Sequence, residues 1–278
     1  MKFTKMHGAG NDYVYVDCTK GEVANPNELS KKISDRRFGV GSDGLVLICK
    51  SSVADFRMRM FNADGSEAQM CGNATRCIGK YVFDKGLTTK TELTLETLAG
   101  VKRLSLFVDS GKVRKVTVDM GAPELRPAKI PTLFAGERVV AAPLEVGGKV
   151  FSITCVSMGN PHAVTFVEDV KSFDVHHFGK LIENHALFPE KVNVEFVEPL
   201  SATELRMRVW ERGSGETWAC GTGACATLVA ATLNNLSHGK ATIHLLGGDL
   251  EVEWDKNANL IYMTGEAETV FEGEFCGN

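Results

Sequence analysis

The sequence lacks the marks of several protein classes. None of its hydrophobic runs approaches the length of a membrane-spanning helix, and residues 1–7 lack the apolar core of a signal peptide. The net charge of −4 leaves no basic footprint for nucleic acid or an anionic membrane. The turn at Gly8-Ala-Gly10 is not followed by G-x-G-x-x-G, which argues against a dinucleotide site. We therefore expect a cytoplasmic protein that binds a small molecule, and neither nucleic acid nor membrane.

The eight cysteines are expected to be reduced. A chain of 278 residues without a signal peptide does not need a disulfide framework. The spacings Cys71-x5-Cys77 and Cys220-x4-Cys225 are wider than those of structural zinc sites, and the second cysteine of each pair falls inside a predicted helix. We expect no metal site, and we interpret Cys77 and Cys225 as small core residues.

The chain contains an internal duplication at an offset of 149 residues, which places Cys71 on Cys220. The register holds without a gap, and further matches at this offset are Arg57-Met-Arg59 with Arg206-Met-Arg208, Glu67 with Glu216, Gly72 with Gly221, Asn11 with Asn160 and Asn62 with Glu211. Polar residues near the cysteines therefore recur along with the apolar ones. We interpret this as two copies of one structural unit.

The predicted domains follow from the duplication. The length suits about two domains at roughly 150 residues each. Three prolines within nine residues (Pro123, Pro127 and Pro131) predict a linker after Gly121. We assign residues 1–121 and 265–278 to an N-terminal half with Cys71, and residues 122–264 to a C-terminal half with Cys220. The last fourteen residues match nothing in the repeat and are expected to pack on the first half.

Each half combines one central helix with many short strands. Eight of the ten residues from Ala224 to Leu233 are apolar, so the helix after Cys220 is predicted to be buried on all sides. Its counterpart runs from Cys71 to Lys85, and further helices are predicted at 27–38 and 175–187. The remaining segments alternate like strands. We predict an α+β fold of two similar halves, each a curled mixed β-sheet around a central apolar helix.

The two cysteines share a chemical setting, because each lies where a turn opens into a helix. The macrodipole and unpaired amides at a helix N-terminus favour a thiolate and bind a carboxylate. Two opposed thiols suit a reaction in which one removes a proton from a stereocentre and the other returns a proton to the opposite face. That reaction is a racemisation or an epimerisation.

At this point the sequence resembles the diaminopimelate epimerase family over essentially its whole length. The segments that carry the resemblance are Met6-His-Gly-Ala-Gly-Asn-Asp12, Met70-Cys-Gly-Asn-Ala-Thr-Arg76, Gly159-Asn-Pro-His162, Val192-Asn193 and Glu211-Arg-Gly-Ser-Gly-Glu-Thr-Trp-Ala-Cys-Gly-Thr-Gly223. The resemblance implies a pyridoxal-phosphate-independent and metal-free interconversion of LL- and meso-diaminopimelate, without a cofactor. It also implies an active site between two similar halves, a role in lysine and peptidoglycan precursor biosynthesis, and a homodimer.

The resemblance assigns roles residue by residue. Cys71 and Cys220 are the acid and base pair, and His162 and Glu211, in predicted turns, are candidates to accept a thiol proton. The residues expected to bind the substrate are Asn11, Asn62, Gly72, Asn73, Asn160, Asn193, Glu211, Arg212, Gly221 and Thr222. Arg212 offers a bidentate fork to a carboxylate, and the amides at Gly72-Asn73 and Gly221-Thr222 face the reacting carboxylate.

Two departures and two alternatives qualify this interpretation. Ala74 stands where the family more often has glycine, and Gly44 stands where some members carry a polar side chain. A related two-cysteine racemase of the proline racemase type has the same logic, but it has no distal amino-acid group to hold. A thiol redox or zinc-binding module is the alternative outside enzymes.

Overall fold

The computed structural model describes residues 1–276, which form two compact units. The first unit comprises Met1–Asp119 and Thr264–Asn278, and the second comprises Met120–Met263. No helix of the described residues is both long and apolar enough to cross a membrane.

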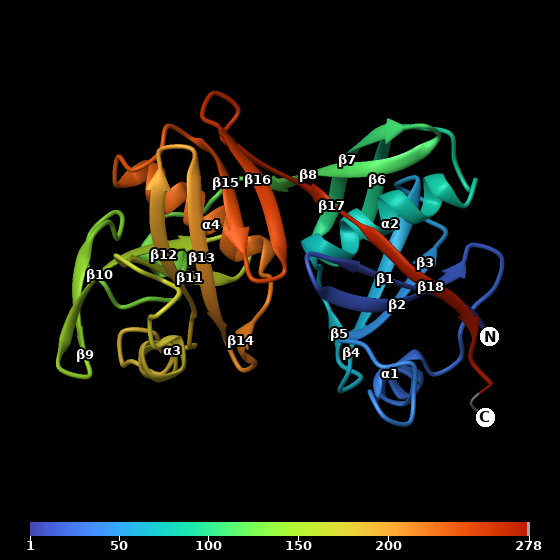
Figure 1. Cartoon of the computed structure of the whole chain (residues 1–278), viewed down its shortest axis with the longest axis horizontal. Coiled ribbons are helices and arrows are strands. Elements are labelled where there is room, and N and C mark those ends of the chain that lie inside the picture. The colour runs from blue at the N-terminus through green and yellow to red at the C-terminus, as the bar shows by residue number, and fades with distance from the viewer. Residues whose placement is uncertain (277–278) are drawn as a thin grey trace. The chain divides into compact units, whose positions relative to one another are not determined.

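The first unit is a mixed sheet with two helices. Its elements are β1 (Lys2–Gly8), β2 (Asn11–Cys18), α1 (Pro26–Ser34), β3 (Gly44–Cys49), β4 (Phe56–Asn62), β5 (Glu67–Ala68), α2 (Gly72–Asp84), β6 (Glu92–Thr97), β7 (Gly100–Asp109), most of β8 (Lys112–Gly121) and β18 (Glu268–Glu274). The strands pair in the order β18, β1, β2, β3, β4, β6, β7, β8, with β5 also on β4. Only β2–β3 and β4–β6 of these pairs are parallel. Figure 1 shows β18 beside β1, where the end of the chain completes this sheet.

The second unit has the same plan. Its elements are a 3-10 turn at Pro127–Lys129, β9 (Ala142–Val146), β10 (Lys149–Ser157), β11 (Pro161–Phe166), α3 (Val175–Glu183), β12 (Asn193–Ser201), β13 (Glu204–Glu211), β14 (Gly215–Thr217), α4 (Gly221–Leu233), β15 (Lys240–Leu245), β16 (Gly248–Asp255) and most of β17 (Leu260–Glu266). The strands pair in the order β9, β10, β11, β12, β13, β15, β16, with β14 also on β13. The parallel pairs are β11–β12 and β13–β15, in the same places as in the first unit.

The repeat is visible in the element boundaries. The helices α2 and α4 differ by 149 residues at both ends, from Gly72 to Gly221 and from Asp84 to Leu233. The helices α1 and α3 are offset by the same number, from Pro26 to Val175. Both are shorter than predicted, ending at Ser34 and Glu183.

The central helices explain why each sheet curls. In α4 every residue from Gly223 to Ala231 is buried, so no face is left for solvent. The helix contacts β10, β11, β12, β13, β15 and β16 of its own unit. In the first unit α2 contacts β1, β2 and β7. The predicted α+β class, with a sheet wrapped around a central helix, is confirmed, and Cys77 and Cys225 are fully buried core residues as predicted.

The proline-rich segment after Gly121 is not the predicted linker. Ile130 and Val139 are buried in the core of the second unit, together with Phe178 of α3. The backbone is also tied to the sheet, since Cys155 donates its N–H to the carbonyl of Val139 at 3.0 Å. Proline content signals an irregular path, but the apolar residues within and after the proline-rich stretch decide whether that path packs.

Candidate functional site

Each of the two site cysteines is the residue immediately before a central helix. Cys71 and Cys220 are the N-cap residues of α2 and α4, both with extended backbone (φ −138° and −125°). Their carbonyls accept the first helical bonds, from Thr75 and Ala224, at 2.9 Å. The amides of the first turn have no partner within a helix, so each thiol lies beside N–H groups that favour a negative charge.

The Cys71 thiol contacts an asparagine of the first turn of the chain. Its Sγ donates to Oδ1 of Asn11 at 3.3 Å, and Nδ2 of Asn73 donates to the same oxygen at 3.2 Å. Gly10 (φ 79°) and Ala9 (φ 52°) carry the left-handed turn before Asn11. Ala9 and Gly10, and not the asparagine, therefore provide the left-handed conformation, and the Asn11 side chain is available for contacts.

The Asn11 side chain is hydrogen-bonded to a cluster of charged residues. Its Nδ2 donates to Oδ2 of Asp43 at 2.8 Å, and Asp43 also pairs with Arg36 at 2.8 Å. Burial, and then the charge of Asp12, raise the pKa of Asp43. Burial acts in the same direction on Asp12, but hydrogen bonds from Arg36 and Lys5 outweigh it and lower the pKa of that carboxyl. The sequence alone indicates a structural or surface charge at Asp43, because nothing in the pattern distinguishes it from one.

Asn73 is oriented by a buried arginine that sequence analysis also missed. Arg76 is fully buried, and its Nη2 donates to Oδ1 of Asn73 at 2.9 Å. Its Nε donates to the carbonyl of Glu266 at 3.3 Å. Because Oδ1 is occupied by Arg76, the Asn73 amide nitrogen faces Asn11.

The Cys220 thiol lies in an enclosed environment. Its side chain is buried, and its Sγ accepts from the Gly223 N–H at 3.4 Å and lies 3.5 Å from Oγ1 of Thr222. Burial raises the pKa of Cys220 well above its usual range, and the charges of Glu211 and Glu195 act in the same direction. The structure therefore favours the neutral thiol here.

Glu211 is the carboxyl partner of this thiol. It ends β13 and accepts a hydrogen bond from Oγ1 of Thr217. Burial raises the pKa of Glu211, while hydrogen bonds from Thr217 and Cys220 partly offset that rise. The Glu211 carboxyl and the Cys220 thiol both have raised pKa values and each affects the pKa of the other, so together they form a pair that can exchange one proton.

His162 does not lie in a turn as predicted. It is part of β11 and is fully buried. Its Nδ1 lies 2.7 Å from Oε1 of Glu195, and its Nε2 lies 3.0 Å from Oδ1 of Asn160. Both ring nitrogens are thus occupied within the protein. The signal for Glu195 was present in the sequence, because Glu195 is two residues from Asn193 and shares its face of the strand.

Asn193 supports the segment that carries Arg212. Its Oδ1 accepts from the Arg212 backbone N–H at 2.9 Å, and its Nδ2 donates to the carbonyl of Pro161 at 2.8 Å. Arg212 itself is exposed, and its Nη1 donates to the carbonyl of Glu190 at 3.1 Å.

In the other unit Asn62 ends β4 and its Nδ2 donates to Oγ of Ser66 at 3.0 Å.

Glu67 and Glu216 have a structural role in both units. Arg59 pairs with Glu67 at 2.8 Å, and Arg208 pairs with Glu216 at 2.6 Å. These equivalent ion pairs connect β4 to β5 and β13 to β14, the segments that lead into the two cysteines. Glu67 and Glu216, which are not among the predicted site residues, are thus engaged in ion pairs within their own units.

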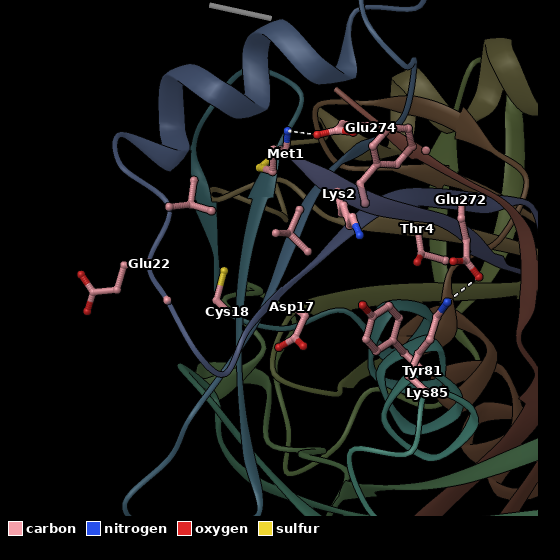
Figure 2. A pocket seen from close by; sticks show the side chains of 15 residues that line it. Met1, Lys2, Thr4, Asp17, Cys18, Glu22, Tyr81, Lys85, Glu272 and Glu274 are labelled. Atoms are coloured by element: carbon pink, nitrogen blue, oxygen red, sulfur yellow. Dashed lines mark ion pairs between the residues drawn. The ribbon is translucent and has the colours of Figure 1, made fainter. Parts of the chain in front are cut away.

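A groove of about 750 Å³ in the first unit contains none of the predicted site residues. Figure 2 shows its lining, which includes Asp17 and Cys18 of β2. Lys85, at the end of α2 remote from Cys71, pairs there with Glu272. The described residues contain no group of three or more His, Cys, Asp or Glu side chains arranged to hold a metal ion.

Comparison with known proteins places the chain in a family. The sequence model of diaminopimelate epimerase matches residues 3–126 and 154–270. The diaminopimelate epimerase of Acetivibrio thermocellus is 60% identical over 274 residues, covering 99% of this chain and 98% of that one. The enzyme of that name from Methanococcus maripaludis strain C5 is 57% identical over 274 residues, covering 99% of both chains.

Solved structures with the same fold are more distant in sequence. A PhzF-family phenazine biosynthesis protein of Bacillus anthracis has a TM-score of 0.71 at 18% identity, covering 99% of this chain and 98% of that one. A hydroxyproline epimerase of Agrobacterium vitis has a TM-score of 0.71 at 15% identity, covering 98% of this chain and 91% of that one. These two show the fold alone. From the family match and the near full-length relatives together, the chain belongs to the diaminopimelate epimerase family.

Proposed function

We propose that this protein interconverts LL- and meso-diaminopimelate without a cofactor, using Cys71 and Cys220 as the two proton-transfer groups. The observation that supports this most is the matched placement of the two thiols, each at the N-cap of an equivalent helix. The near full-length relatives that carry the name diaminopimelate epimerase support the substrate.

In the proposed reaction one cysteine, as thiolate, takes the α-proton, and the other, as thiol, gives a proton to the opposite face. The Cys220 environment favours the thiol. The charge of Glu211 raises the pKa of Cys220, so this carboxyl is the proposed group that restores the proton of the thiol after turnover. The reverse direction uses the same groups with the protonation states of the two cysteines exchanged.

The proposed contacts with the reacting carboxylate are backbone amides. They belong to Gly72 and Asn73 in α2 and to Gly221 and Thr222 in α4, at the positive ends of the two helices. Charge that builds on the carboxylate as the α-proton leaves is stabilised by donors already oriented for it. A metal or pyridoxal phosphate is then not required for acidity at the α-carbon.

The proposed contacts with the distal amino-acid group are polar side chains. Arg212 is exposed at the start of a turn, and Asn193 fixes its backbone. We assign the remaining substrate contacts to Asn11, Asn62 and Asn160. His162 supports Asn160 through a hydrogen bond. A homodimer and a cytoplasmic location are part of the same proposal.

The first test is substrate choice by the reduced, purified protein. We expect turnover of LL-diaminopimelate and none of L-proline or trans-4-hydroxy-L-proline. Arg212→Ala should raise KM for diaminopimelate, because a charged hydrogen bond is lost, by about 10- to 100-fold. Arg126→Ala is the control, since its exposed guanidinium pairs with the neighbouring Glu124.

Two results contradict this proposal. Turnover of proline without turnover of diaminopimelate assigns the chain to the shorter substrates. Stoichiometric zinc in protein purified under reductant contradicts a metal-free reaction.

A further inference from the structure

Glu195 is a buried carboxyl group that the proposed reaction does not use. It lies on β12 with no exposed surface, and its Oε1 is 2.7 Å from Nδ1 of His162. No described residue is a hydrogen-bond partner of its other oxygen. Burying such a group is costly. At the equivalent position the first unit has Val46, also fully buried, so packing alone does not require a carboxyl there.

The contact with His162 continues to a predicted substrate residue. On the far side of the ring, Nε2 lies 3.0 Å from Oδ1 of Asn160. Glu195, His162 and Asn160 therefore form a chain of carboxyl, imidazole and carboxamide. Only the Asn160 end of this chain belongs to a turn, at the entry to β11.

The position of one proton sets the polarity of this chain. If a single proton is shared between Glu195 Oε1 and His162 Nδ1, the pair is electrically neutral, and Nε2 must carry its own hydrogen. Two other proton placements are less favourable. If Glu195 is ionised beside a neutral ring that carries its hydrogen on Nδ1, the pair buries a net charge. If the proton is instead on Oε2 of Glu195, a buried O–H donor has no acceptor among the described residues. The shared proton avoids both costs, so Nε2 donates to Oδ1 of Asn160.

The equivalent asparagine of the first unit is held the opposite way. The Nδ2 of Asn11 donates to Asp43, and its Oδ1 accepts from the Cys71 thiol and from Asn73. For Asn160 the oxygen is the occupied end and the N–H groups are the end left for a ligand. Two residues that match in the repeat thus differ in hydrogen-bonding polarity.

We propose that Glu195 is a positioning residue which, through His162, fixes the Asn160 carboxamide with its N–H groups directed to an acceptor on the substrate. Asp43 fixes Asn11 the other way round, because it accepts a hydrogen bond from the amide nitrogen of Asn11. The proposal rests on the proposed function in taking an amino acid, whose carboxylate is the acceptor, as the ligand. It makes the two half-sites chemically distinct although their backbones correspond.

The direct test is the protonation of His162 in ligand-free protein. We would label the histidines with 15N and record ring-nitrogen spectra near neutral pH, using His162→Gln to assign the signals. The expected result is a protonated Nε2 and a strongly deshielded Nδ1 proton that disappears in Glu195→Val. The control Glu198→Gln, on the same strand and paired with Arg206, should keep that proton signal. An unprotonated Nε2 overturns the proposal.

Kinetics give a second and independent test. Glu195→Val places the residue of the first unit at this position, and we expect KM for LL-diaminopimelate to rise about 10- to 100-fold with a smaller change in kcat. A folded Glu195→Val protein with wild-type KM overturns the proposal. If the variant does not fold, the spectrum of the wild-type protein decides. If the wild-type protein does not turn over diaminopimelate, the proposed function fails, whereas the measurement on His162 keeps its meaning.

Discussion

At the residue scale, the two half-sites differ in how they support their thiols. Cys71 is hydrogen-bonded to an amide oxygen, whereas Cys220 lies beside the carboxyls of Glu211 and Glu195. The difference extends to Gly223, whose equivalent in the first unit is Ala74. A Cβ at Gly223 would lie 2.8 Å from Oε1 of Glu195 and 3.3 Å from Sγ of Cys220. Ala74, which departs from the family pattern, therefore occurs in the first unit, where Val46 stands in place of the Glu195 carboxyl.

Gly223→Ala is expected to reduce activity much more than stability. The methyl group displaces Glu195 from His162 and crowds the Cys220 thiol, so we expect kcat/KM to fall by about 10-fold or more. The reverse change, Ala74→Gly, should keep kcat/KM and cost about 1 kcal/mol of unfolding free energy, as glycine does in a helix. Steady-state kinetics with urea unfolding checks both variants. A Gly223→Ala enzyme with wild-type kcat/KM contradicts the proposed contact.

The candidate site could be proposed from the sequence at positions where a chemically suitable residue recurs in the repeat. The cysteines, Asn11 and Asn160 each carry a polar function and recur at one offset. Asp43 and Arg76 were missed because their roles depend on tertiary contacts that a local pattern does not contain. Glu195 was missed although its place on the strand, two residues from Asn193, was a signal in the sequence.

At the element scale, short helices pack closely on the strands that lead to the cysteines. The helix α3 contacts β13 and β14, and Trp210 of β13 donates to Glu183 at the end of α3 at 2.8 Å. Gly179 makes this approach possible, since a Cβ there would lie 2.5 Å from Cβ of Trp210. The prediction of a helix over 175–187 was right about its start. It was wrong about its end, because the pattern does not show where α3 stops.

Gly179→Ala is expected to destabilise the protein although alanine is the better helix former. The added methyl group forces α3 away from β13, at a cost of about 1–3 kcal/mol in the free energy of unfolding. Gly21→Ala serves as control, because a Cβ there meets no atom within 4 Å, and its change should stay within about 0.5 kcal/mol. Urea unfolding of the two variants measures the difference. Equal stability of both would show that α3 is not held at this distance.

At the scale of the whole molecule, the fold class followed from the duplication and from one apolar helix per copy. The proline-rich segment did not follow, because composition alone cannot show that Ile130 and Val139 enter the core of the second unit. Both units also bury cysteines that are not among the candidate site residues. Burial raises the pKa of Cys77 to about 12, and burial likewise raises the pKa of Cys155 to about 12, from a usual 9.0.

These buried thiols predict a loss of stability at alkaline pH. Above pH 9 the thiols ionise in the unfolded chain but stay neutral in the folded one, so unfolding is increasingly favoured until the pH passes about 12. Each thiol contributes up to about 1.4 kcal/mol per pH unit across that window. Unfolding free energies between pH 8 and 11 should therefore fall less steeply for Cys77→Ala and Cys155→Ala than for wild type. Cys276→Ala, at an exposed site, should keep the wild-type slope. Parallel curves for all four proteins would contradict the prediction.

The two-thiol reaction is tested most directly by following hydrogen exchange during epimerisation. Reduced protein is incubated with LL-diaminopimelate in D2O, alongside Cys71→Ala and Cys220→Ala, and the products are analysed by mass spectrometry and NMR. We expect meso product with one solvent deuteron at the inverted α-carbon for wild type, and no such product for either variant. Meso product without solvent deuterium, or a variant that still epimerises, would contradict the two-thiol reaction.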